Sequence, residues 1–138
     1  MPDQDVRTVT GANKGIGREV AAGLAALGLT VLVGARDRCR AGEAAAGSVA
    51  AGGDAYPPSK AALNALTVQY AKALRADGIP VNAAAPGACA TDFTKDLGSA
   101  YSITRTAAQG AAVVIRLATL EGDGPTGGFF DDEGPVRW

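Results

Sequence analysis

A glycine-rich loop between a strand-like and a helix-like segment most constrains the fold of this 138-residue chain. Residues 6–10 have strand length, and residues 11–17 (Gly-Ala-Asn-Lys-Gly-Ile-Gly) follow them directly. The helix behind the loop is indicated by apolar residues at helical spacing: Ile16, Val20, Leu24 and Leu27. Glycines let a backbone approach a pyrophosphate, and a helix N-terminus offers unpaired N–H groups and partial positive charge. The loop therefore predicts a nucleotide phosphate site, with a tight turn that binds no ligand as the alternative.

The rest of the chain continues to alternate between strand-like and helix-like segments. Further strands are predicted over residues 30–35, 79–85 and 128–131. Helices are predicted over residues 38–51, 58–76 and 106–120, and a loop over residues 88–101. This alternation favours the α/β class with a parallel sheet. We expect a Rossmann-like three-layer domain with a reduced sheet of four strands, in the spatial order second, first, third, fourth, because an empty slot would leave backbone groups unpaired.

Composition excludes several classes of function. The net charge of −1 and the lack of a basic run argue against a nucleic-acid partner. No apolar stretch is long enough to span a membrane and no signal sequence precedes the loop, so we expect a cytoplasmic protein without a membrane partner. The chain has no histidine, and Cys39 and Cys89 match no metal or redox spacing, so no metal site is expected. The remaining carboxylates are interpreted as a solvated surface: Asp92, Asp96, Asp131, Asp132 and Glu133.

A second motif follows the loop after a short interval. Tyr56 and Lys60 are four residues apart and would share one face of a helix. The run Ser-Lys-Ala-Ala-Leu-Asn-Ala-Leu-Thr at residues 59–67 surrounds this pair. Together with Thr-Gly-Ala-Asn-Lys-Gly-Ile-Gly at residues 10–17, these motifs resemble the short-chain dehydrogenase/reductase family, in its carbonyl-reductase-like branch. The resemblance covers two blocks, residues 1–53 and 56–138, within a single shortened Rossmann-like dinucleotide-binding domain.

The resemblance implies an NADP(H)-dependent oxidoreductase that reduces a carbonyl or oxidises an alcohol. Tyr56 would be the proton donor to the carbonyl, and Lys60 would lower the tyrosine pKa and hold the nicotinamide ribose. Thr91 would reach the nicotinamide carboxamide from the turn that begins at Pro86 and Gly87. The residues implied to bind the cofactor are Gly11, Asn13, Lys14, Gly15, Ile16, Gly17, Arg36, Lys60, Pro86, Gly87 and Thr91. The partner would be a small-molecule carbonyl or alcohol, and a homo-oligomer or pairing with a longer relative stays open.

Arg36 stands just beyond the second predicted strand, where the choice between the two nicotinamide cofactors is made. An acidic residue there would hold a ribose 2′-hydroxyl, whereas an arginine accommodates a 2′-phosphate. Arg36 therefore favours NADP(H), and Lys14 in the loop adds positive charge. The alternative for Arg36 is an ordinary solvated surface arginine.

The chain departs from the family between its two motifs. Tyr56 lies 39 positions after Gly17, whereas three strands and their crossover helices separate these motifs in the family. Because a βαβ unit takes about 30 residues or more, roughly 90 residues of the expected fold have no counterpart. No residue corresponds to the family's catalytic serine or proton-relay asparagine. We therefore expect impaired activity, with a non-catalytic nucleotide-binding remnant, or a subunit that pairs with a full-length relative, as the alternative.

Overall fold

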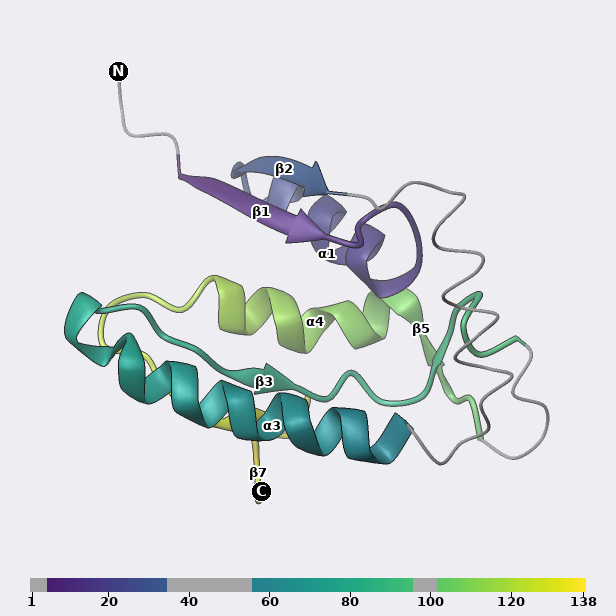
Figure 1. Ribbon diagram of the computed structural model, residues 1–138. Coiled ribbons are helices and arrows are strands. Elements are labelled where there is room, and N and C mark those ends of the chain that lie inside the picture. Colours follow the sequence, from purple (N-terminus) through teal and green to yellow (C-terminus); the bar gives the residue numbers. More distant parts are fainter. Residues whose placement is uncertain (1–4, 35–55, 96–101) are drawn as a thin grey trace. The chain divides into compact units, whose positions relative to one another are not determined.

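The computed structural model describes residues 5–34, 56–95 and 102–138 (Figure 1). Contacts divide the chain into two compact units, each described by itself. The first contains Met1–Ala35, Ala84–Leu120 and Asp131–Glu133, and the second Arg36–Ala83, Glu121–Phe130 and Gly134–Trp138. The helix predicted over residues 38–51, Arg36 and Cys39 lie outside the described residues. A single domain over residues 1–138 stays a prediction.

The first unit begins with the predicted strand–loop–helix–strand. Strands β1 (Val6–Thr10) and β2 (Thr30–Gly34) are parallel, with Val6 opposite Thr30 and Thr10 opposite Gly34 (Figure 1). Helix α1 (Gly15–Ala26) connects them and buries Val20 and Leu24. Val9 of β1 packs against this pair. Because successive side chains of a strand point to opposite faces, one face of β1 lies against the helix.

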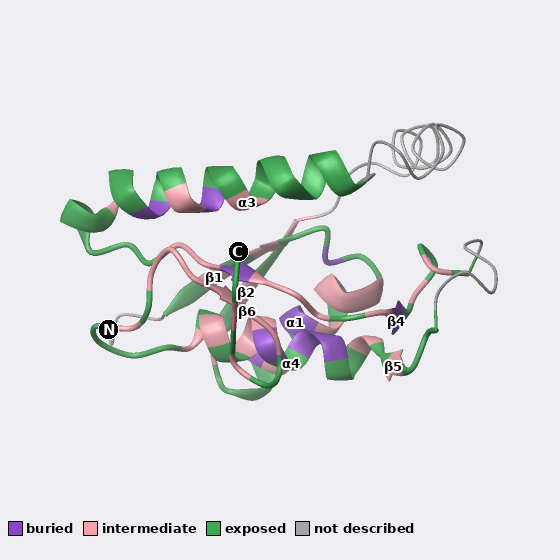
Figure 2. Ribbon diagram, turned by 90° about the horizontal axis from the view of Figure 1, so that it is seen from below, coloured by how far each residue is buried: buried purple, intermediate pink, exposed green. Residues whose placement is uncertain are grey.

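Helix α4 (Ala107–Ala118) completes the core of the first unit. The buried Ala111 joins Val20 and Leu24 in one apolar cluster, and burial is concentrated in α1 and α4 (Figure 2). A capping box starts α4: the Thr106 hydroxyl accepts from the Gln109 N–H, and Gln109 Oε1 accepts from the Thr106 N–H. Strand β4 (Cys89–Ala90) pairs in parallel with β5 (Arg105–Thr106), just before that cap.

The second unit contains helix α3 (Tyr56–Ala73), the 3₁₀ helix η1 (Arg75–Asp77) and a small sheet. The sheet has the order β3 (Ala83–Ala84), β6 (Phe129–Phe130) and β7 (Pro135–Val136), and the last two are antiparallel. The Ala83 N–H donates to the Gly128 carbonyl with an N···O distance of 2.9 Å. β3 thus pairs with the C-terminal part of the chain.

Helix α3 begins earlier than the sequence predicts and exposes a different face. We expected it to start at Pro58, but it includes Tyr56 and Pro57. Prolines are tolerated there because the first N–H groups of a helix have no intrahelical partner. Most of α3 is exposed (Figure 2), and the buried residues among those described are Thr67 and Ala71. The larger apolar residues Leu63, Leu66 and Tyr70 are about half exposed.

The α/β class is confirmed, but the predicted pairing of the strands is wrong for the described residues. β1 and β3 belong to different sheets, and β3 pairs with β6 rather than with β1. The strand predicted over residues 79–85 shortens to two residues. Pro80 has no N–H to donate, and the N–H of Val81 donates to the Thr126 hydroxyl instead of to a strand. The sequence also missed three short strands: β4, β5 and β7.

None of the described helices is long and apolar enough to cross a membrane.

Candidate nucleotide-binding site

The glycine loop of the first unit is shaped by two residues with positive φ. Gly11 (φ 67°) turns the chain out of β1, and Gly15 (φ 57°) starts α1. Both angles lie in the left-handed region that glycine adopts without a Cβ penalty. The Ala12 N–H donates to the Gly34 carbonyl with an N···O distance of 3.1 Å, and Ala12 is buried. This bond ties the loop to the end of β2. The Rossmann pattern places the pyrophosphate at this loop and at the N-terminus of the helix that follows it.

Gly17 allows the helix to approach the loop closely. A Cβ at this position would lie 2.5 Å from the Gly11 carbonyl oxygen and 3.3 Å from the Ala12 Cα. Both neighbours are backbone atoms, which cannot rotate away from the added carbon. The third glycine of the motif thus holds α1 against the loop.

The N-terminus of α1 carries no counter-charge of its own. Lys14 is the N-cap in an extended conformation, makes no side-chain cap hydrogen bond, and no acidic residue lies in the first turn. The unpaired N–H groups and the helix dipole therefore leave partial positive charge at this end. Such an end can accept an anionic group.

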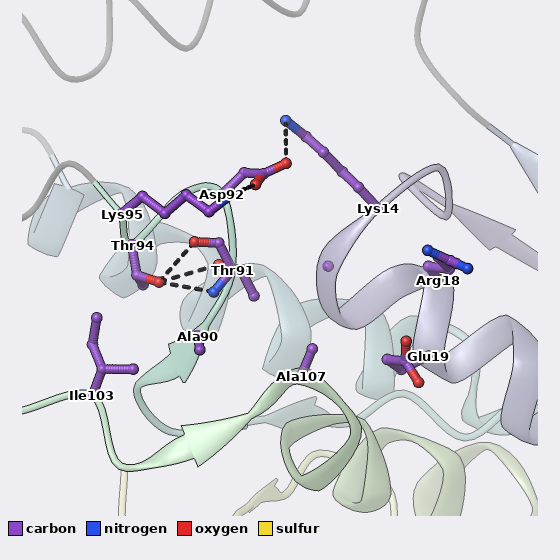
Figure 3. Close-up of a pocket in the computed structure, with 11 residues that line it drawn as sticks. Lys14, Arg18, Glu19, Ala90, Thr91, Asp92, Thr94, Lys95, Ile103 and Ala107 are labelled. Carbon is purple, nitrogen blue, oxygen red and sulfur yellow. Dashed lines mark hydrogen bonds and ion pairs between the residues drawn. The ribbon is translucent and has the colours of Figure 1, made fainter.

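A pocket of about 420 Å³ opens beside this helix end (Figure 3). Lys14, Gly15 and Arg18 line one side of it, and Thr91 lines the other, from the segment that follows β4. A Cβ at Gly15 would lie 3.5 Å from the Thr91 methyl carbon, so these two segments are in van der Waals reach. The apolar part of the lining comes from Ala90, Ile103 and Ala107. The fold thus joins the predicted phosphate loop and Thr91 at one pocket.

Thr94 holds the segment after β4 in shape, although the sequence analysis did not single it out. Its hydroxyl accepts from the Thr91 N–H at 2.9 Å and lies 2.8 Å from the Cys89 carbonyl. The Thr94 N–H also donates to the Thr91 carbonyl at 3.1 Å. A threonine three residues after another, beyond a strand, was the available signal for such a turn.

Asp92 makes ion pairs with cations from both sides of the pocket (Figure 3). Its Oδ1 lies 2.6 Å from Lys95 Nζ, and its Oδ2 lies 3.7 Å from Lys14 Nζ. The hydrogen bond from Lys95, together with the charges of Lys95 and Lys14, lowers the pKa of the Asp92 carboxyl. Asp92 was predicted to lie on a solvated surface; its side chain is half exposed, and it also lines the pocket.

Pro86 and Gly87 belong to the same unit but are absent from the described lining of this pocket. The Pro86 carbonyl accepts from the Cys89 thiol at 3.3 Å, and Gly87 turns the chain with φ 76°. Arg105 Cδ would lie 3.0 Å from a Cβ at Gly87, and its guanidinium pairs with Asp132 at 2.7 Å. That hydrogen bond lowers the pKa of Asp132.

Comparison with known proteins adds an independent observation. Residues 45–102 match the family described as short chain dehydrogenase. Salutaridine reductase of Papaver bracteatum is 39% identical over 79 residues, which cover 57% of this chain and 23% of that protein. (+)-Neomenthol dehydrogenase of Capsicum annuum is 40% identical over 76 residues, which cover 55% of this chain and 22% of that protein. These matches support membership of the short-chain dehydrogenase/reductase family over part of the chain.

The chain aligns with less than a quarter of the length of these curated relatives. The family has a Rossmann-like α/β fold, and the described helices and small parallel sheets agree with a shortened α/β domain. The matched residues include Tyr56, Lys60 and Thr91 but not the glycine loop.

The predicted site residues of this chain fall in two places. Tyr56 and Lys60 lie one turn apart on α3, in the second unit, and Lys60 is exposed. The glycine loop and Thr91 lie in the first unit. Arg36 is outside the described residues. The catalytic roles of Tyr56 and Lys60 and the cofactor contact of Arg36 stay predictions.

Proposed function

We propose that this chain is an NADP(H)-binding short-chain oxidoreductase domain whose substrate is a small carbonyl or alcohol. The observation that carries the proposal is the pocket against which Lys14, Gly15 and Thr91 lie together. Its size falls within the range of small-molecule sites. A cytoplasmic location belongs to the same proposal.

The lining of the pocket suits the chemistry of a nicotinamide nucleotide. The uncapped end of α1, with Lys14 and Arg18, would hold phosphate groups. The Thr91 hydroxyl would face the carboxamide, and Ile103 and Ala107 offer apolar surface to a ring. The loop glycines leave room for a pyrophosphate to approach the backbone.

The chemistry of the proposed reaction is reduction of a carbonyl to an alcohol or its reverse. A bound NADPH would supply the hydride. Tyr56 would donate its phenolic proton to the carbonyl oxygen, and the Lys60 ammonium, one turn away on α3, would favour the tyrosinate that remains. We propose low turnover by the chain alone, because it has no counterpart of the family's catalytic serine and asparagine.

A second candidate is a non-catalytic nucleotide-binding remnant, or a subunit that pairs with a full-length relative. The observation in its favour is that the loop and the pocket are built within one unit, whereas Tyr56 and Lys60 belong to the other. Nucleotide binding in the first unit would therefore not require the catalytic pair.

Cofactor binding tests the proposal directly. Titration of the purified chain with NADPH and NADH, followed by calorimetry or cofactor fluorescence, should give a lower dissociation constant for NADPH. Arg36→Asp should remove this preference, while the same charge change at the exposed Arg137 should leave it intact. Equal binding of the two cofactors by the unmodified chain would show that the Arg36 assignment is wrong. Absence of binding to either cofactor would overturn the proposal.

Turnover separates the two candidates. NADPH consumption should be followed on a panel of aldehydes and ketones, with and without a full-length relative. Binding without turnover favours the remnant, and activity that requires the longer relative favours the subunit. Robust reduction by the chain alone would contradict the proposed impairment.

A further inference from the structure

We propose that Asp92 is an internal counter-ion that sets the phosphate affinity of the pocket. It holds Lys14 and Lys95 while the pocket is empty, and the phosphate of an incoming ligand displaces it. This inference rests on the proposed function and adds an affinity-setting residue to the same site.

The geometry places Asp92 between cations from two separate segments (Figure 3). Lys14 caps α1, and Lys95 belongs to the segment after β4. Asp92 uses a different oxygen for each, at 3.7 Å from Lys14 Nζ and 2.6 Å from Lys95 Nζ. One carboxylate thus engages two of the cationic groups that a phosphate would need.

The ion pairs are exposed enough to be exchanged. The side chain of Asp92 is 50% exposed, and those of Lys14 and Lys95 are 62% and 72% exposed. Ion pairs in such contact with water are weak and are screened by salt. A pyrophosphate group carries more charge and more acceptor oxygens than a carboxylate, so it can replace Asp92 at these ammonium groups.

Asp92 is also charged and held in place. The hydrogen bond from Lys95 lowers its pKa, so the carboxylate is ionised at neutral pH. The hydrogen bonds between Thr91 and Thr94 fix the backbone turn that carries it.

The charge balance of the lining gives the direction of the effect. Three cations line the pocket, Lys14, Arg18 and Lys95, against two carboxylates, Glu19 and Asp92. The described lining therefore has a formal net charge of +1, and neutralising Asp92 raises it to +2 (three minus one). Replacement of Asp92 should remove one carboxylate partner from each of the two lysines and should also remove repulsion of the ligand.

The test compares Asp92→Asn with the unmodified chain. Probes are NADPH and inorganic pyrophosphate, titrated by calorimetry at several salt concentrations. Asp92→Asn should lower both dissociation constants by roughly threefold to tenfold, as expected for one exposed charge. The affinity of the Asp92→Asn variant for both probes should also fall more steeply with salt than that of the unmodified chain, because more cationic groups contact the ligand directly. Asp123→Asn makes the same charge change outside the lining and should leave both constants unchanged.

A second variant tests the role of Lys95. Lys95→Gln should weaken pyrophosphate binding by about threefold, and the double variant with Asp92→Asn should return toward the unmodified affinity. Dissociation constants for Asp92→Asn equal to or above those of the unmodified chain would overturn the counter-ion role. If no form binds NADPH, the proposed function fails, and the pyrophosphate titration still decides the role of Asp92 by the same comparison.

Discussion

Gly17→Ala tests whether close contact between backbone segments is what requires a glycine at the start of α1. The added Cβ would lie 2.5 Å from the Gly11 carbonyl oxygen and 3.0 Å from the Gly11 carbonyl carbon. Overpacking of this kind costs about 1–3 kcal/mol. Alanine in place of glycine favours a helix by about 1 kcal/mol. Because the clashing atoms belong to the backbone, we expect an overpacking cost in the upper part of its range. The gain in helix propensity offsets part of this cost, which leaves a net loss of about 1–2 kcal/mol in the free energy of unfolding.

The loss should be visible in thermal unfolding of the purified chain. For a protein of this size, 1 kcal/mol shifts the unfolding midpoint by about 2–4 °C, so Gly17→Ala should lower it by roughly 2–8 °C. The affinity for NADPH should fall as well, because the loop must move away from the helix end that would hold the phosphates.

Gly34→Ala is the matched control, since it adds the same carbon within the first unit. Its Cβ would meet the Thr10 Cα at 3.5 Å, an ordinary van der Waals distance. We expect little change in its midpoint. A Gly17→Ala variant that unfolds at or above the temperature of the unmodified chain, with unchanged NADPH affinity, would refute the role assigned to this contact.

Three further changes test the helix cap, an ion pair and the catalytic assignment. Thr106→Ala removes the hydroxyl that accepts from the Gln109 N–H and should cost about 1 kcal/mol in urea unfolding. Asp132→Asn should destabilise the chain at neutral pH but not in acid. Arg105 lowers the folded pKa of Asp132, so its stabilisation is present above the unfolded pKa of about 4 and is lost as pH falls through the folded value. Tyr56→Phe should reduce carbonyl turnover only slightly, because the unmodified chain is expected to have little.

Each of these results has a control and a contradicting outcome. Thr106→Ser keeps a hydroxyl and should retain most of the stability; equal losses for both variants would exclude the cap as the cause. A difference between Asp132→Asn and the unmodified chain that is the same at neutral and acid pH would contradict the ion-pair explanation. Strong turnover abolished by Tyr56→Phe would show that the shortened chain has a complete catalytic site.

The sequence alone was sufficient for the features that depend on near neighbours. β1, α1, β2 and α4 were predicted close to their observed bounds, because apolar spacing marks which side of an element is buried. The position of the glycine loop between β1 and α1 also followed from the sequence, and the positive φ of Gly11 and Gly15 uses the conformational freedom of glycine. The excess of positive charge at the N-terminus of α1 also depends only on neighbouring residues, because Lys14 is the N-cap and the first turn has no acidic residue.

Only the tertiary structure decided which distant segments meet. The choice of β6 as the partner of β3 depends on hydrogen bonds across more than forty positions, such as that between Asn82 Oδ1 and the Gly128 N–H. The approach of Asp92 to Lys14 has the same origin, because nothing near either residue specifies the other. Local pattern determines which surface an element buries, whereas its partner depends on competition among all surfaces of the folded chain. For that reason the glycine loop could be recognised from the sequence, and the carboxylate beside it could not.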